Sequence, residues 1–201
     1  ARRRLTATSV MVVGPALAAA AIDALAKAAE GTAQIGLHFT LTGPFNPVTD
    51  RFRPLERGRF RSIGRMLALA LARRLDPDQL AAEAHAQLAV FAERFGRPPD
   101  YVDGHQHVHL LPQVRDAVLA AMTTLAPNAW ARQCGRVSRG FRDPKALLID
   151  RLSVRFRRAA TAQGIATNPA FSGTYRFEPT AEFSVLFPGF LDRLPDCSVV
   201  M

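Results

Sequence analysis

The segment Asp103-Gly104-His105-Gln106-His107-Val108-His109, followed by Leu110-Leu111-Pro112, constrains the fold of this chain most strongly. It places three of the chain's five histidines at alternate positions. Because alternate side chains of an extended strand share one face, Asp103 and the three histidines are expected to point the same way. Pro112 suits the first turn of a helix that follows. The segment predicts a strand, a polar tip and a helix, and in α/β folds chemistry collects at the carboxyl end of a strand.

Imidazole is a common metal ligand, and a neighbouring carboxylate can orient the ring or raise its basicity. Two simpler interpretations compete with a site. A histidine tag is one, but a tag would not lie mid-chain between an apolar strand and an amphipathic helix. A row of solvated residues at a sheet edge is the other. We favour a functional site, because three alternating histidines and an aspartate meet at one strand end.

A fourth histidine, His38, lies in the predicted strand Gln34–Thr42. Its neighbours alternate between an apolar face with Ile35 and Leu37 and a small polar face with Gly36 and Thr40. A lone strand histidine is more often structural than functional. Beside the second histidine cluster, however, His38 fits a ligand with space left for a substrate. His85, on a predicted helix, is expected at the surface or in packing.

Strands and helices alternate along the chain, which predicts a parallel sheet with right-handed crossovers and one domain over residues 1–201. The segment Gly43–Arg61, rich in Pro, Gly and Arg, is expected to form a loop over the mouth of the site. The predicted strands are Thr6–Val13, Gln34–Thr42, Tyr101–Val108 and Ala129–Gln133, with a late strand at Val185–Phe187 or Ser198–Met201. The predicted helices are Ala16–Ala29, Ser62–Arg74, Gln79–Phe95, Gln113–Leu125 and Pro144–Gln163.

The net charge of +9 comes almost wholly from arginine. The cluster Arg51–Arg65 is dense enough to bind phosphate or an anionic membrane surface, although a solvated basic face needs no partner. Nucleic acid is not an expected partner, because no recognition motif is present. Two distant cysteines suggest a reducing compartment and a cytoplasmic protein. The start Arg2-Arg3-Arg4 resembles a secretory signal, but the β-branched run that follows favours a strand.

Two segments, Ile35-Gly36-Leu37-His38-Phe39-Thr40-Leu41-Thr42 and the Asp103–His109 run, resemble the motifs of the YdjC-like carbohydrate deacetylases. The similarity extends to Thr6–Pro15 and to Phe95-Gly96-Arg97-Pro98-Pro99. It implies a distorted, TIM-like β/α barrel. The family's first strand, with its Asp-Asp pair, and its C-terminal segment have no counterpart here, so we expect an incomplete barrel. Unpaired strand edges then favour pairing with another chain, such as a homodimer.

The resemblance implies a hydrolase that removes N-acetyl groups from an amino sugar and uses one divalent metal ion, magnesium or zinc. By motif, His38 and His105 would be metal ligands. His107 is our candidate acid, and Asp103 is the leading candidate base where the Asp-Asp pair is missing. Substrate contacts are expected from His109, Arg132 and Phe171, the last in an aromatic loop over Pro169–Tyr175.

The substrate class stays open between an oligosaccharide and a lipid-linked sugar of the kind found in hopanoid synthesis, which the Arg51–Arg65 cluster would suit at a membrane. Two other classes remain. One is a different histidine-metal hydrolase such as a phosphoesterase, although no histidine follows His109. The other is a degenerate, non-catalytic sugar-binding remnant.

Overall fold

The structure is a computed structural model that describes residues 5–14, 18–137, 144–173 and 182–201. The residues of the expected signal-like start, Arg2–Arg4, and Tyr175 of the expected aromatic loop lie outside these ranges. The elements in chain order are β1 (Ala7–Val10), α1 (Ala19–Ala29), β2 (Gln34–Phe39), β3 (Leu55–Glu56), β4 (Arg59–Phe60), α2 (Ile63–Leu71), α3 (Pro77–Phe95), β5 (Tyr101–Gly104), the 3-10 segment η1 (His105–Leu110), α4 (Val114–Leu125), β6 (Trp130–Ala131), α5 (Pro144–Ala162), β7 (Phe171–Ser172), α6 (Phe183–Leu191) and β8 (Val199–Val200).

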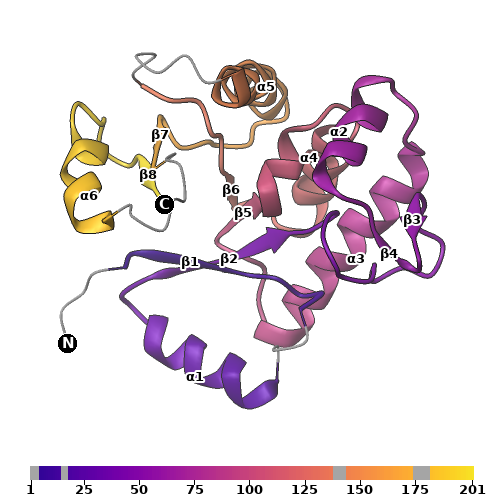
Figure 1. Ribbon diagram of the computed structural model, residues 1–201. Helices are drawn as coiled ribbons and strands as arrows, with labels where there is room; N and C mark the ends of the chain where they lie inside the picture. The colour runs from indigo at the N-terminus through magenta and orange to yellow at the C-terminus, as the bar shows by residue number, and fades with distance from the viewer. Residues whose placement is uncertain (1–4, 15–17, 138–143, 174–181) are drawn as a thin grey trace.

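The main sheet runs β1-β2-β5-β6, and all of its pairs are parallel. Its strands are neighbours in the order in which they occur, as in β/α barrels. A parallel bridge between Ala131 and Thr167 extends this order, and β7 and β8 form a further parallel pair. Figure 1 shows helices α1, α3, α4 and α5 in an arc around the sheet. The expected α/β fold with a parallel sheet is confirmed.

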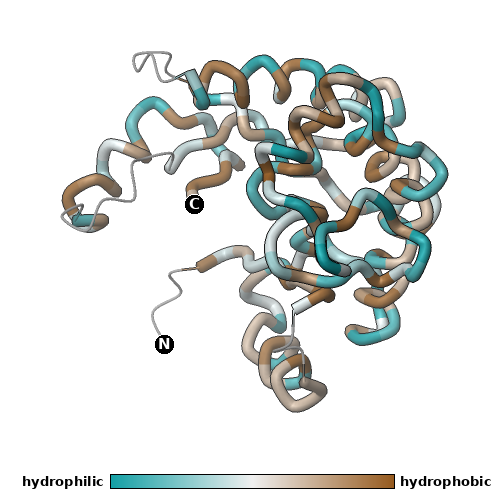
Figure 2. Tube along the Cα trace, turned by 45° about the vertical axis from the view of Figure 1, so that its right-hand side comes forward, coloured by the Kyte–Doolittle hydropathy of each residue, from teal (hydrophilic) through white to brown (hydrophobic). Residues whose placement is uncertain are grey.

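Local chemistry explains the best-defined elements. In β2, Ile35, Leu37 and Phe39 are buried, so the apolar face expected from the alternation packs into the core. Helix α3 begins after Asp76, whose carboxylate accepts from two backbone N–H groups of the first turn, and it ends at Gly96 with a left-handed φ of 65°. Hydrophobic and hydrophilic residues alternate along the helices in Figure 2, as expected of helices that bury one face against the core and expose the other.

The histidine run departs from the sequence prediction. Strand β5 ends at Gly104, and His105–Leu110 forms a 3-10 segment instead of more strand. Gln106 and His107 have φ values of 50° and 60°, in the left-handed region. These two residues turn the chain, so the alternation of strand side chains stops there. The expectation that His105, His107 and His109 share one strand face is therefore wrong.

The segment Gly43–Arg61 is more ordered than expected of a loop. It contains the β3–β4 hairpin, and helix α3 holds it through the buried Glu83 side chain. The Glu83 carboxylate accepts from the backbone N–H groups of Val48 and Thr49, each at 2.9 Å. Gln87 accepts from Thr40 N and donates to Thr40 O, at 3.0 and 2.7 Å. The segment is thus tied to the same helix as the end of β2.

The C-terminal part forms β7, α6 and β8, at the left of Figure 1. Of the two sites predicted for a late strand, the second is confirmed by β8, whereas Val185–Phe187 lies inside α6. Helix α6 is apolar but has no buried residue, and Val185 is 70% exposed. Among the described residues, no helix is long and apolar enough to cross a bilayer. That the whole chain forms one domain stays a prediction.

Candidate functional site

Three neighbouring strands bring Ser9, His38 and Asp103 together. In the parallel β2–β5 pair, His38 lies directly opposite Asp103. Asp103 Oδ1 is 2.7 Å from His38 Nδ1. Ser9, from β1, places its hydroxyl 3.2 Å from both His38 Nδ1 and Asp103 Oδ2. The carboxylate therefore orients the imidazole through Nδ1, and the other ring nitrogen, Nε2, stays available.

Asp103 is a buried, fully engaged carboxylate. Arg132 Nη1 lies 3.0 Å from Asp103 Oδ2, and Arg132 Nη2 donates to Gly104 O at 3.0 Å. Burial alone would raise the pKa of Asp103, but the Arg132 charge and the His38 hydrogen bond hold that pKa below its ordinary value. Asp103 is thus ionised at neutral pH, with its oxygens committed to His38, Ser9 and Arg132.

Ser9, His38 and Asp103 contain the residue types of a serine hydrolase triad, but their geometry differs. In such a triad, serine and aspartate contact opposite nitrogens of the histidine ring. Here, both Ser9 and Asp103 contact His38 Nδ1. His38 cannot accept the Ser9 proton and be oriented by Asp103 at the same time, so this cluster is not arranged for a serine nucleophile.

His105 faces His38 at the start of η1. The two ring centroids are 5.5 Å apart, with an interplanar angle of 71°. The two rings are thus neighbours, and their role as metal ligands stays a prediction. Within the described part of the chain, no partner contacts His38 Nε2 or either ring nitrogen of His105. Burial, and secondly the nearby His38, lower the pKa of His105, which favours the neutral ring that can bind a cation.

The donor set around His38 and His105 fits a divalent ion in part. Two imidazoles with open nitrogens, one of them oriented by a carboxylate, form the arrangement typical of metal-binding histidines. The described residues contain no group of three or more His, Cys, Asp or Glu side chains placed to hold a metal ion. Asp103 is occupied as the orienting partner of His38. Among the described residues, His38 and His105 would therefore offer two ligands to a divalent ion.

His107 lies apart from this pair, against Cys134 and Phe171. Its Nδ1 is 3.2 Å from Cys134 Sγ, and its ring meets the Phe171 ring edge-on, with centroids 5.8 Å apart. Burial, and secondly the Arg132 charge, lower the pKa of His107 to about 3. The ring is thus neutral at pH 7 and does not store a proton for an acid step.

The three residues expected to contact substrate are all buried. His109 is 0% exposed, Arg132 1% and Phe171 3%. His109 Nε2 lies 2.7 Å from Arg132 O, and a Cβ at position 104 would collide with the His109 ring, so only glycine fits there. The Arg132 guanidinium lies over the Phe171 ring, with the guanidinium carbon 5.7 Å from the centroid of that ring. These buried side chains surround Asp103 and the turn after β5, and their contact with a substrate stays a prediction.

Two residues that contact the histidines of the site, Ser9 and Cys134, were not predicted from the sequence. Ser9 is one small residue in a short strand, and no local pattern distinguishes it. Cys134 follows β6 without a C-x-x-C motif, so spacing gave no signal. Both residues reach the histidines only because β1 and β6 lie on opposite sides of the β2–β5 pair. His85 is exposed on α3, as expected.

Two pockets lie near the ends of the sheet. One, of about 550 Å³, is lined by Gly43, Pro44, Phe60 and the hairpin residues Glu56, Arg57 and Arg59. It adjoins the histidine pair, because a Cβ at Gly43 would lie 3.7 Å from His105 Nε2.

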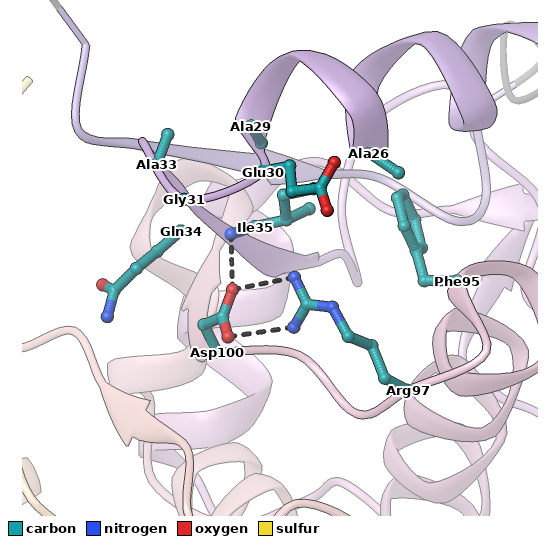
Figure 3. A pocket seen from close by; sticks show the side chains of 10 residues that line it. All are labelled: Ala26, Ala29, Glu30, Gly31, Ala33, Gln34, Ile35, Phe95, Arg97 and Asp100. Atoms are coloured by element: carbon teal, nitrogen blue, oxygen red, sulfur yellow. Dashed lines mark hydrogen bonds and ion pairs between the residues drawn. The ribbon is translucent and has the colours of Figure 1, made fainter.

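The other pocket, of about 360 Å³, is drawn in Figure 3 and lies where β2 and β5 begin. There, Asp100 accepts from Ile35 N at 2.7 Å and pairs with Arg97 at 2.9 Å. These contacts join β2 and the turn before β5, at the end of the strands that is usually structural in β/α barrels.

The model of a family described as YdjC-like protein matches residues 1–198. The chain is 37% identical over 82 residues to the chitooligosaccharide deacetylase of Proteus mirabilis (strain HI4320), a stretch covering 40% of this chain and 30% of that protein. It is 42% identical over 82 residues to the chitooligosaccharide deacetylase of Yersinia enterocolitica serotype O:8 / biotype 1B (strain NCTC 13174 / 8081), covering 40% and 31%. The matched stretch thus spans less than a third of each relative.

A solved structure from Enterococcus faecalis V583, provisionally described as a cellobiose-phosphate cleavage protein, superposes with a TM-score of 0.65. The match covers 97% of this chain and 68% of that one, at 19% identity, and supports the fold. The match to the family model, by contrast, extends over nearly the whole sequence. The chain therefore belongs to the YdjC-like family.

Proposed function

We propose that the protein is a metal-dependent hydrolase that removes the N-acetyl group from an amino sugar. The observation that carries the proposal is the His38–His105 pair, whose ring centroids lie 5.5 Å apart while Asp103 orients the His38 ring. The chitooligosaccharide deacetylases that match part of this chain support the substrate class. An oligosaccharide is favoured over a lipid-linked sugar, because both of those relatives are named for oligosaccharides.

His38 and His105 would hold a divalent ion, zinc or magnesium, through neutral imidazole nitrogens. When bound, such an ion lowers the pKa of water and polarises an amide carbonyl. Asp103 keeps the His38 ring in the tautomer that leaves Nε2 free. Asp103 is unsuited to take a proton from water, because Arg132 and Ser9 occupy its other oxygen. We assign it orientation of His38 in place of the base role.

His107 is proposed to act as a hydrogen-bond donor. A neutral imidazole next to the reacting amide can donate to the carbonyl oxygen as negative charge develops there. This role suits the depressed pKa of His107 better than the acid role expected from the sequence. The sugar is proposed to occupy the 550 Å³ pocket beside Gly43, where the Phe45 ring also lies against His105, with centroids 6.0 Å apart.

Acetate release from N-acetylglucosamine oligomers tests the proposal. The purified protein is stripped with a chelator, and zinc or magnesium is then added back. We expect acetate release that depends on the added ion and is lost in His38→Ala and His105→Ala. Absence of acetate release with every ion, while the two variants bind sugar as the wild type does, would point to a non-catalytic sugar-binding protein instead.

A further inference from the structure

The Cys134 thiol contacts the His107 ring at Nδ1. Its Sγ lies 3.2 Å from His107 Nδ1, and its side chain is 1% exposed. The position of Cys134 is itself fixed, because its backbone N–H donates to the Ser153 hydroxyl of α5 at 3.1 Å. The thiol is therefore a permanent neighbour of the ring and not a mobile surface group.

The Nε2 edge of the His107 ring lies opposite the contact with Cys134 and is free to meet a ligand. Phe171 meets the ring edge-on, and the left-handed backbone of His107 fixes the direction in which the ring leaves the chain. In the described part of the molecule, no hydrogen-bond partner is found for His107 Nε2, and this atom is not among the buried unpaired ones.

The Cys134–His107 contact allows three arrangements of its protons. The first, a thiolate with an imidazolium, would make Cys134 a nucleophile. Burial opposes it, because the Cys134 side chain is only 1% exposed, and burial raises the pKa of its thiol to about 11 despite the nearby Arg132 guanidinium. Two neutral arrangements remain: the ring donates from Nδ1 to sulfur, or the thiol donates to Nδ1. An imidazole nitrogen is a good acceptor and a thiol sulfur a weak one, so the second is favoured.

We propose that Cys134 is a positioning residue, whose S–H donates to His107 Nδ1 and so fixes this ring as the Nε2–H tautomer. The ring then presents a donor, and not an acceptor, on its open side. The consequence for catalysis rests on the proposed function: a fixed Nε2–H can stabilise negative charge on an acetamide oxygen without reorganising during the reaction. The tautomer itself is independent of that function.

Long-range ¹H–¹⁵N NMR of the uniformly ¹⁵N-labelled protein at pH 7 reads the tautomer directly. His107→Asn identifies the His107 signals. We expect the wild type to show the neutral Nε2–H pattern. Cys134→Ala should give a mixture of tautomers, whereas Cys134→Ser, which keeps a donor, should retain the wild-type pattern. The exposed Cys197→Ser is the matched control and should change nothing.

An Nδ1–H or imidazolium pattern in the wild type overturns the proposal, even if Cys134→Ala does not fold. A folded Cys134→Ala protein with an unchanged tautomer overturns it as well. In the acetate assay, we expect Cys134→Ala to lower kcat about tenfold with little change in KM, and Cys134→Ser to restore most of it. If no form releases acetate, the proposed function fails, and the tautomer is still decided by the spectra.

Discussion

Asp103 Oδ1 lies 2.7 Å from His38 Nδ1, and the two residues are direct partners in the register of β2 and β5. The contact is therefore set by backbone pairing and not by a flexible loop. Arg132 holds the second carboxylate oxygen, so rotation of the carboxylate away from His38 would break an ion pair. The His38 ring is thus pre-oriented before any cation arrives, which lowers the entropic cost of binding one.

Asp103→Asn should weaken zinc binding about 10- to 100-fold, because a neutral amide no longer places a negative charge behind the His38 ring. Titration calorimetry of the metal-free protein measures the affinity. The variant leaves the buried Arg132 without its partner charge, so a loss of about 3–5 kcal/mol in the free energy of unfolding is also expected. The titration is therefore run well below the melting temperature.

Asp150→Asn is the control for Asp103→Asn. It removes the carboxylate of another partly buried ion pair, with Arg136 at 2.9 Å, away from the histidines. Zinc affinity should then be unchanged. Equal affinities in the wild type and Asp103→Asn would show that Asp103 does not support a metal ligand.

His105→Ala should remove stoichiometric zinc binding and acetate release while leaving the fold intact. The side chain is half-buried, and neither of its ring nitrogens has a partner within the described residues, so little stability is lost. Metal content by elemental analysis and thermal melting measure the two effects. His85→Ala, at an exposed position on α3, should behave as the wild type in both.

His109→Ala should act on stability first. It opens a cavity at a position with no exposure and removes the hydrogen bond to Arg132 O. We expect the free energy of unfolding to fall by about 2–4 kcal/mol, measured by urea denaturation. Zinc stoichiometry of the folded variant should stay at the wild-type value. Loss of zinc without loss of stability would mean that His109 is a ligand and not a support.

Thiol alkylation should distinguish the two cysteines by their reactivity. Cys134 is buried, and its pKa of about 11 against an ordinary 9.0 leaves roughly a hundredfold less thiolate at pH 8. Cys197 is exposed. Iodoacetamide added to the native protein should therefore add one label, at Cys197, as seen by mass spectrometry of peptides. Rapid labelling of Cys134 at pH 8 would contradict the burial and the shifted pKa.

The sheet was predictable because its signals are local. The alternation in Gln34–Thr42 identified β2 and the polar face with His38, and the strand predicted over Tyr101–Val108 contains β5. The turn after β5 was not predictable in the same way. Its left-handed residues are Gln106 and His107, and neither is the glycine or asparagine that normally marks such a backbone. The alternation of histidines therefore resembled a strand that the backbone does not form.

The roles of the residues that surround Asp103 could not be predicted from local sequence patterns either, for a different reason. Arg132 and Phe171 were noticed, but whether an arginine is a surface contact or a buried counter-ion depends on which strands flank it. Asp103 attracts Arg132 into the interior, and Phe171 covers the guanidinium. Only the assembled order β1-β2-β5-β6 supplies that information.

The Glu83 contacts to Val48 and Thr49 have a kinetic consequence for the segment that walls the larger pocket. A buried helix residue holds these two amides, so they are released only when α3 or its packing opens. Their exchange with solvent deuterium should follow the slow amides of α3 and not the fast amides of a surface loop. That result would identify the segment Gly43–Arg61 as a fixed wall of the pocket beside His105 and not as a closing lid.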